Sequence, residues 1–177
     1  MTPQEEQRLK EQFIVNNPHA NKGLKAAAGH VKLYANNVTS RQKEEIKRFW
    51  VQTIDVLAEK YVVLQTLDRF VSDVCELRNQ MNNRFPDAFV DGEFPFSRAQ
   101  KSFSVVLKYL WCDNRIAMPP TCPIDRGVLR EMGAPYDSWN WTEMTQNQYM
   151  LAYTRLQELA RDADLSVAQM ELLWFSH

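Results

Sequence analysis

The segment from Ser97 to Cys112 is the feature of this sequence that most constrains its fold. On a helix built over these residues, apolar side chains such as Phe103 and Trp111 occupy nearly every face. A helix that is apolar all round must be covered by other elements, so we expect this segment to be the central, buried helix. Ser97-Arg98-Ala99-Gln100 reads as a capping box that begins it.

Helical patterns also account for most of the remaining chain. Apolar residues recur at three- and four-residue spacing behind helix-starting residues, with Pro or Gly near the predicted ends. The predicted helices run from Thr2 to about Val15, Lys22 to Ala35, Thr39 or Ser40 through Leu57, Leu67 to Leu77, Ile124 to Met132, Thr145 to Ala163, and onward from Ser166. Only Tyr61–Leu64 resembles a strand. We therefore predict an all-α fold in one domain, since 177 residues suffice for one continuous core.

Several classes of site are excluded by the cysteines and histidines. Cys75, Cys112 and Cys122 form no CxxC pair, and the three histidines stand far apart. We therefore expect no disulfide framework, no bound metal and no cofactor, and we expect a reducing, cytoplasmic location. No apolar run approaches the roughly 20 residues of a membrane span, so we expect no membrane partner.

Lys101 and Asp125 are the residues whose placement points to chemistry. Lys101 falls in the first turn of the predicted central helix, and Asp125 stands where the next short helix begins. Two helix N-termini can therefore face one cleft and lend it partial positive charge. A lysine in apolar surroundings loses its proton more readily, which makes its amine a nucleophile. A carboxylate beside it can stabilise a cationic intermediate or orient water.

These two segments resemble the helix-hairpin-helix-GPD superfamily of DNA glycosylases. Lys101-Ser-Phe-Ser-Val-Val-Leu107 is similar to the family's helix of the type Lys-Thr-Ala-Asn-Val-Val-Leu. Pro123-Ile-Asp-Arg-Gly-Val-Leu-Arg130 is similar to its Val-Asp-Thr-His-Val-x-Arg segment. The resemblance covers about 40 residues and places Lys101 on the Schiff-base lysine and Asp125 on the catalytic aspartate.

The resemblance implies a two-lobed, all-helical architecture with the active-site cleft between the lobes. A damaged or modified base would be flipped out of DNA into that cleft and excised, with strand cleavage if Lys101 forms a Schiff base. Basic N-terminal helices would cover about 20–60, the hairpin-like and catalytic segment about 95–135, and C-terminal helices 142–177. Ser97 and Ala99 stand where the family's DNA-gripping hairpin has glycines.

An uneven charge distribution supports DNA as the partner. Residues 20–50 contain seven basic and two acidic residues, a net charge of +5, inside a chain of net charge −1. A basic face is what phosphate binding requires, and it would place the protein on the nucleoid of a bacterium or phage-infected cell. The candidate DNA-binding residues are Lys22, Lys25, Lys32, Lys47, Arg48, Ser97, Arg98, Ala99 and Arg126. Trp139 and Trp141 are candidates for stacking on the extruded base.

Two other classes of function stay open. A helical interaction protein, such as a defence or anti-defence factor, could keep a glycosylase-like shell without catalysis and bind a protein partner. The acidic remainder of the chain and the missing hairpin glycines favour that alternative. An RNA-directed binder that uses the basic stretch is a third possibility.

Overall fold

The computed structural model describes residues 1–17 and 32–175, and the part of the chain that it describes is all-helical, which confirms the predicted fold class. The main helices are α1 (Pro3–Asn16), α3 (Ser40–Ala58), α4 (Leu67–Arg84), α5 (Phe96–Cys112), α6 (Arg126–Met132), α7 (Gln146–Asp162) and α8 (Val167–Trp174). Three short 3-10 helices, η1 (Glu59–Val62), η2 (Tyr136–Ser138) and η3 (Trp141–Glu143), lie between them.

Side-chain caps set where most of these helices begin. Thr2, Thr39, Thr145 and Ser166 each accept a hydrogen bond from the backbone three residues later, and the residue at that position returns one, so each forms a capping box. Each reciprocal pair satisfies two backbone donors that a helix end leaves open. The start sites predicted at these positions are therefore confirmed, with Thr39 rather than Ser40 as the cap.

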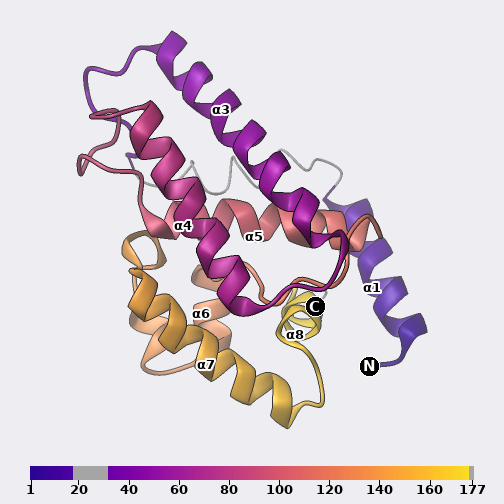
Figure 1. Ribbon diagram of the computed structural model, residues 1–177. Helices are drawn as coiled ribbons and strands as arrows, with labels where there is room; N and C mark the ends of the chain where they lie inside the picture. The colour runs from indigo at the N-terminus through magenta and orange to yellow at the C-terminus, as the bar shows by residue number, and fades with distance from the viewer. Residues whose placement is uncertain (18–31, 176–177) are drawn as a thin grey trace.

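Helix α5 is the centre of the molecule, as its all-round apolar character predicts. Figure 1 shows α3 and α4 crossing α5, while α6, α7 and α8 gather below it in the same view. The Trp50 indole on α3 donates a 2.9 Å hydrogen bond to the Ser102 hydroxyl on α5. Phe103 is fully buried on α5 and stacks on Phe70 of α4 at 5.6 Å. These contacts anchor the two crossing helices to α5.

Three local predictions need correction. Ser97 does not cap α5, because the helix begins one residue earlier behind Pro95 and the Ser97 hydroxyl instead donates to the Thr142 carbonyl at 2.6 Å. Residues 32–35 are not helical, and Tyr34 forms an isolated antiparallel bridge with Phe89. The rest of the helix predicted from Lys22 to Ala35 lies outside the described residues. Tyr61–Leu64 is not a strand, since η1 extends to Val62.

One large apolar core runs through the structure. It joins buried side chains of α3, α4, α5, α6, α7 and α8, and a smaller cluster connects α1 to the end of α5 and to α8. The two-lobed arrangement with a cleft stays a prediction. Within the described ranges, no helix combines the length and apolar character that a bilayer crossing needs.

The three cysteines should differ sharply in their reactivity. Burial raises the pKa of Cys112 to about 12, and burial raises the pKa of Cys122 well above its ordinary value, whereas Cys75 is half-buried with a smaller upward shift. Because the thiolate is the reactive form, we expect alkylation near pH 8 to modify Cys75 at least about tenfold faster than the other two. Mass spectrometry of the native and the urea-unfolded protein measures this, and equal labelling of all three in the native protein would contradict the packing described.

Candidate functional site

Lys101 and Asp125 lie side by side in the folded protein. The Lys101 Nζ donates a hydrogen bond to the Asp125 Oδ2, across a sequence separation of 24 residues. A second hydrogen bond joins the same two segments: the Gln100 side-chain amide on α5 donates to the carbonyl of Ile124, the residue before Asp125, at 2.8 Å. The sequence-based expectation that these two side chains are neighbours is met, and their catalytic roles stay predictions.

The start of α6 fixes the orientation of the Asp125 carboxylate. Asp125 is the N-cap of α6, and its Oδ1 accepts hydrogen bonds from the backbone N–H groups of Gly127 at 2.9 Å and Val128 at 3.2 Å. This cap satisfies open donors of the helix and leaves Oδ2 for Lys101. The Asp125 side chain is 19% exposed and that of Lys101 is 8% exposed, so Asp125 forms the outer edge of the pair.

A second buried ion pair, formed by residues outside the predicted site, stands beside the first. The Lys108 ammonium contacts both carboxylate oxygens of Glu171 on α8, at 2.8 and 2.7 Å, and the two side chains are 6% and 2% exposed. Burial raises the pKa of Glu171, and the charge of Lys108 opposes that shift. The Phe13 and Phe175 rings flank the ammonium at 4.3 and 4.4 Å.

A signal for this second pair was present in the sequence. Lys108 follows Lys101 by seven residues, which is two helical turns, so the two ammonium groups project from one face of α5. Two lysines on one face of an otherwise apolar helix require buried anionic partners. The chain supplies these partners as Asp125 and Glu171, from two helices on the same side of α5. Each pair also influences the other, since the charges of Lys101 and Asp125 act on the Glu171 carboxyl.

The hairpin-like residues are not available to a DNA phosphate. Ser97, Arg98 and Ala99 lie in the first turn of α5 and are 0%, 2% and 0% exposed. The Arg98 guanidinium packs over the Trp141 ring at 4.9 Å, and burial lowers its pKa. Contact of these three residues with DNA stays a prediction, and it would require the turn to be uncovered, because core packing covers it in this structure.

Carboxylates surround the outer side of that turn. Two adjacent hollows beside the start of α5, of about 340 and 80 Å³, are both lined by Asp91, Glu93 and Glu143. Arg78 lines the larger hollow and forms an ion pair with Glu93. Lys32 and Arg98 line the smaller one. The hollows therefore carry both anionic and cationic side chains, and the Glu93 charge is compensated by Arg78.

The two candidate stacking tryptophans have different surroundings. Trp141, in η3, is 9% exposed and contributes to the core beneath Arg98. Trp139 is half-buried and packs at a tilt on Tyr136, with ring centroids 5.0 Å apart. Base stacking by Trp141 stays a prediction, and in this structure its ring packs in the core, whereas Trp139 retains a partly exposed ring.

The basic residues predicted to bind DNA lie partly on the surface and partly outside the described residues. Lys32, Lys47 and Arg48 are exposed, and Lys47 pairs with Glu44 at 2.6 Å. Lys22 and Lys25 lie outside the described residues. Arg126 is exposed at the first position of α6, directly after Asp125, and its guanidinium reaches the Trp139 carbonyl at 3.5 Å. Of the basic candidates within the described residues, Arg126 is the one that lies next to the Lys101–Asp125 pair.

No family model, curated protein or solved structure matches this chain. Among the described residues, no group of three or more His, Cys, Asp or Glu side chains is placed to hold a metal ion. The candidate site is therefore described from the structure alone. The Lys101 amine contacts the Asp125 carboxylate, the exposed Arg126 follows Asp125, and the buried Lys108–Glu171 ion pair lies nearby.

Proposed function

We propose that this protein excises a damaged or modified base from DNA, with Lys101 and Asp125 as its catalytic residues. The observation that supports the proposal is the contact between the Lys101 amine and the Asp125 carboxylate. These are the two positions on which the resemblance to the helix-hairpin-helix-GPD glycosylases places its lysine and aspartate. The two-lobed cleft and base flipping belong to the same proposal.

The chemistry follows from the roles that the two groups can take. Lys101 must be neutral to attack the sugar C1′, and the Asp125 Oδ2 accepts its proton. Asp125 passes this proton to the departing base, so the bond from C1′ to the base breaks as the bond from the Lys101 Nζ to C1′ forms, and the restored carboxylate stabilises the positive charge of the intermediate. The C1′–O4′ bond of the sugar then opens, with a proton moving from the Lys101 nitrogen to O4′, which gives the lysine Schiff base from which strand cleavage by β-elimination follows.

Substrate approaches from the Asp125 side in this proposal. That side of the pair is the more exposed one, and Arg126 at the next position can bind a phosphate that flanks the extruded nucleotide. Helix α6 also presents its N-terminus there, which adds partial positive charge. The exposed basic side chains of Lys32, Lys47 and Arg48 contribute general electrostatic attraction for DNA rather than contacts at the reacting sugar.

Borohydride trapping on duplex DNA tests this function. Duplexes that contain one abasic site, or one oxidised, alkylated or bulky modified base, are incubated with protein and reductant, and adducts are separated on a gel. We expect adduct formation by the wild type and a loss of about a hundredfold or more in Lys101→Arg, which keeps the ion pair but cannot form the Schiff base. Arg155→Gln, at a partly exposed position where the arginine pairs with Glu158, is the matched surface control, with trapping expected within about twofold of wild type.

Base release by the same variants separates the roles of the two residues. Asp125→Asn keeps an N-cap on α6 while it removes the negative charge, so base release should fall by at least about a hundredfold. Full activity in Asp125→Asn would overturn the site assignment. Unchanged base release in Lys101→Arg, without any adduct in the wild type, would assign the attack to water instead.

A second function is favoured by a separate observation. The buried first turn of α5 is unsuited to a hairpin contact with DNA and suits a non-catalytic interaction protein. Duplex binding as a function of salt distinguishes the two. Affinity that falls steeply with salt supports the enzyme, whereas no duplex binding at any salt concentration supports the interaction protein.

A further inference from the structure

Gln100 is a buried polar residue next to Lys101 that the proposed chemistry does not use. It lies on α5 and is 0% exposed. Its side-chain nitrogen donates to the Ile124 carbonyl at 2.8 Å, whereas its Oε1 is buried and accepts no hydrogen bond from the described residues. A buried oxygen without a donor costs more free energy than a neutral hydrogen bond commonly returns. The unpaired atom therefore indicates that Gln100 serves a purpose other than stability.

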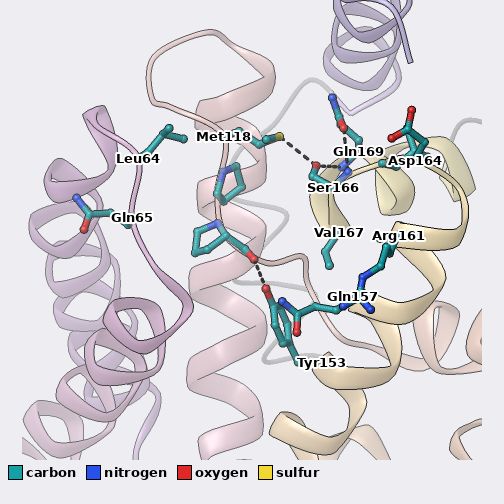
Figure 2. A pocket seen from close by; sticks show the side chains of 14 residues that line it. Leu64, Gln65, Met118, Tyr153, Gln157, Arg161, Asp164, Ser166, Val167 and Gln169 are labelled. Atoms are coloured by element: carbon teal, nitrogen blue, oxygen red, sulfur yellow. Dashed lines mark hydrogen bonds between the residues drawn. The ribbon is translucent and has the colours of Figure 1, made fainter.

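Other parts of the structure around Asp125 are attached to α7. Figure 2 shows the Tyr153 hydroxyl on α7 donating to the carbonyl of Pro120, in the loop that leads to Asp125, at 2.9 Å. Helix α6, which follows Asp125, makes its main contacts with η2 and α7. None of these contacts joins Asp125 to α5. The hydrogen bond from Gln100 to Ile124 is therefore a direct tie between α5 and the residue before Asp125.

Peptide geometry carries the effect of this tie from Ile124 to Asp125. The Ile124 carbonyl and the Asp125 nitrogen belong to one peptide unit, which is planar. A hydrogen bond that fixes the direction of the carbonyl therefore also fixes the position of the Asp125 Cα. Because Gln100 and Lys101 are neighbours on α5, the two hydrogen bonds and the two chain segments close a ring. Within this ring, the Gln100 amide sets the point from which the Asp125 carboxylate reaches Lys101.

We propose that Gln100 is a positioning residue for base excision, whose side-chain amide holds Asp125 where its Oδ2 meets the Lys101 amine. This inference rests on the proposed function of the Lys101–Asp125 pair. Gln100 acts through Asp125, so it affects the geometry of the reacting groups rather than the binding of DNA. Loss of its amide donor should therefore slow the reaction of bound DNA and leave the affinity for DNA nearly unchanged.

Single-turnover borohydride trapping on a duplex with one abasic site tests the positioning role. Gln100→Met keeps the length of the side chain and removes the donor. Its maximum trapping rate should fall by about tenfold or more, while the duplex concentration that gives half of that rate changes by less than about twofold. Tyr153→Phe is the matched control, since it also removes a side-chain hydrogen bond to a carbonyl of the same loop, and its rate should stay within about twofold of wild type. Urea unfolding checks that each variant folds.

The pH profile of Gln100→Glu separates positioning from packing. A glutamate side chain has the same length, but it can donate to the Ile124 carbonyl only while it is protonated, and burial raises the pKa of such a carboxyl. Its trapping rate, divided by the wild-type rate at the same pH, should therefore rise at least about threefold from about pH 8 to about pH 6. The same ratio for Gln100→Met should stay constant, because that side chain has no donor at any pH.

Amide hydrogen exchange in the free protein gives a readout that needs no DNA. The Asp125 carboxylate caps the Gly127 and Val128 amides, so both should exchange at least about fivefold faster in Gln100→Met and at the wild-type rate in Tyr153→Phe. Unchanged exchange or wild-type trapping in Gln100→Met would overturn the positioning role, as would equal trapping losses in Gln100→Met and Tyr153→Phe or parallel pH profiles for Gln100→Glu and the wild type. A wild type that forms no adduct would instead contradict the proposed function, and the exchange rates would then decide whether Gln100 places Asp125.

Discussion

Replacement of Glu171 with leucine is expected to destabilise the protein by about 3–5 kcal/mol, because the Lys108 ammonium would remain buried without its counter-charge. Lys108 and Glu171 are 6% and 2% exposed, so water cannot take over the interaction. The Phe13 and Phe175 rings beside the ammonium offset only part of this cost. Urea unfolding followed by tryptophan fluorescence measures the change.

A double substitution separates charge burial from packing. In Lys108→Met with Glu171→Leu, both charges are replaced by apolar groups of similar length, so stability should return to within about 1–2 kcal/mol of the wild type. A surface pair provides the comparison: removal of Glu158, which pairs with Arg155 at exposed positions, should cost less than about 1 kcal/mol. A Glu171→Leu variant as stable as the wild type would contradict the burial of this pair.

Asp125→Ala should cost about 3–5 kcal/mol as well, for two reasons that act together. The substitution removes both cap hydrogen bonds at the start of α6, which are worth about 1–2 kcal/mol. It also leaves the buried Lys101 amine without its carboxylate, which accounts for the larger share. Thermal and urea unfolding of the purified variant measure the total.

Thr145→Ala is the matched control for this prediction. Thr145 caps α7 with the same kind of side-chain hydrogen bond but holds no buried charge, so its loss should cost only about 1 kcal/mol. The stability loss in Asp125→Asn should lie between those of Asp125→Ala and Thr145→Ala, because an asparagine oxygen can still accept the cap hydrogen bonds. Equal costs for Asp125→Ala and Thr145→Ala would show that the contact with Lys101 contributes nothing to stability.

Most of the fold was predictable from local sequence signals. The capping boxes at Thr2, Thr39, Thr145 and Ser166 are self-contained motifs, so they identify helix starts without knowledge of the tertiary structure. The false capping box at Ser97 shows the limit of such signals. The Ser97 hydroxyl donates a hydrogen bond to the Thr142 carbonyl, a tertiary contact, and Pro95 is the N-cap residue of the helix instead.

The candidate site was predictable only in part. Lys101 and Asp125 were predictable because both lie in short motifs, whereas their contact depends on the tertiary placement of the start of α6 beside α5. The spacing of Lys101 and Lys108 indicates that Lys108 needs a buried anionic partner, but the identity of Glu171 as that partner depends on α8 folding back onto α5, a contact across 63 residues. The burial of Arg98 and Trp141 likewise depends on the whole core, so no local pattern indicates it.

Peptide mapping of the borohydride-trapped adduct tests the central claim most directly. The protein is reacted with a duplex that contains a single abasic site, reduced, digested, and analysed by mass spectrometry for a lysine that carries the sugar remnant. The account predicts the remnant on Lys101, with none on the exposed Lys47. A remnant confined to surface lysines or to the N-terminal amine, with Lys101 unmodified, would contradict it.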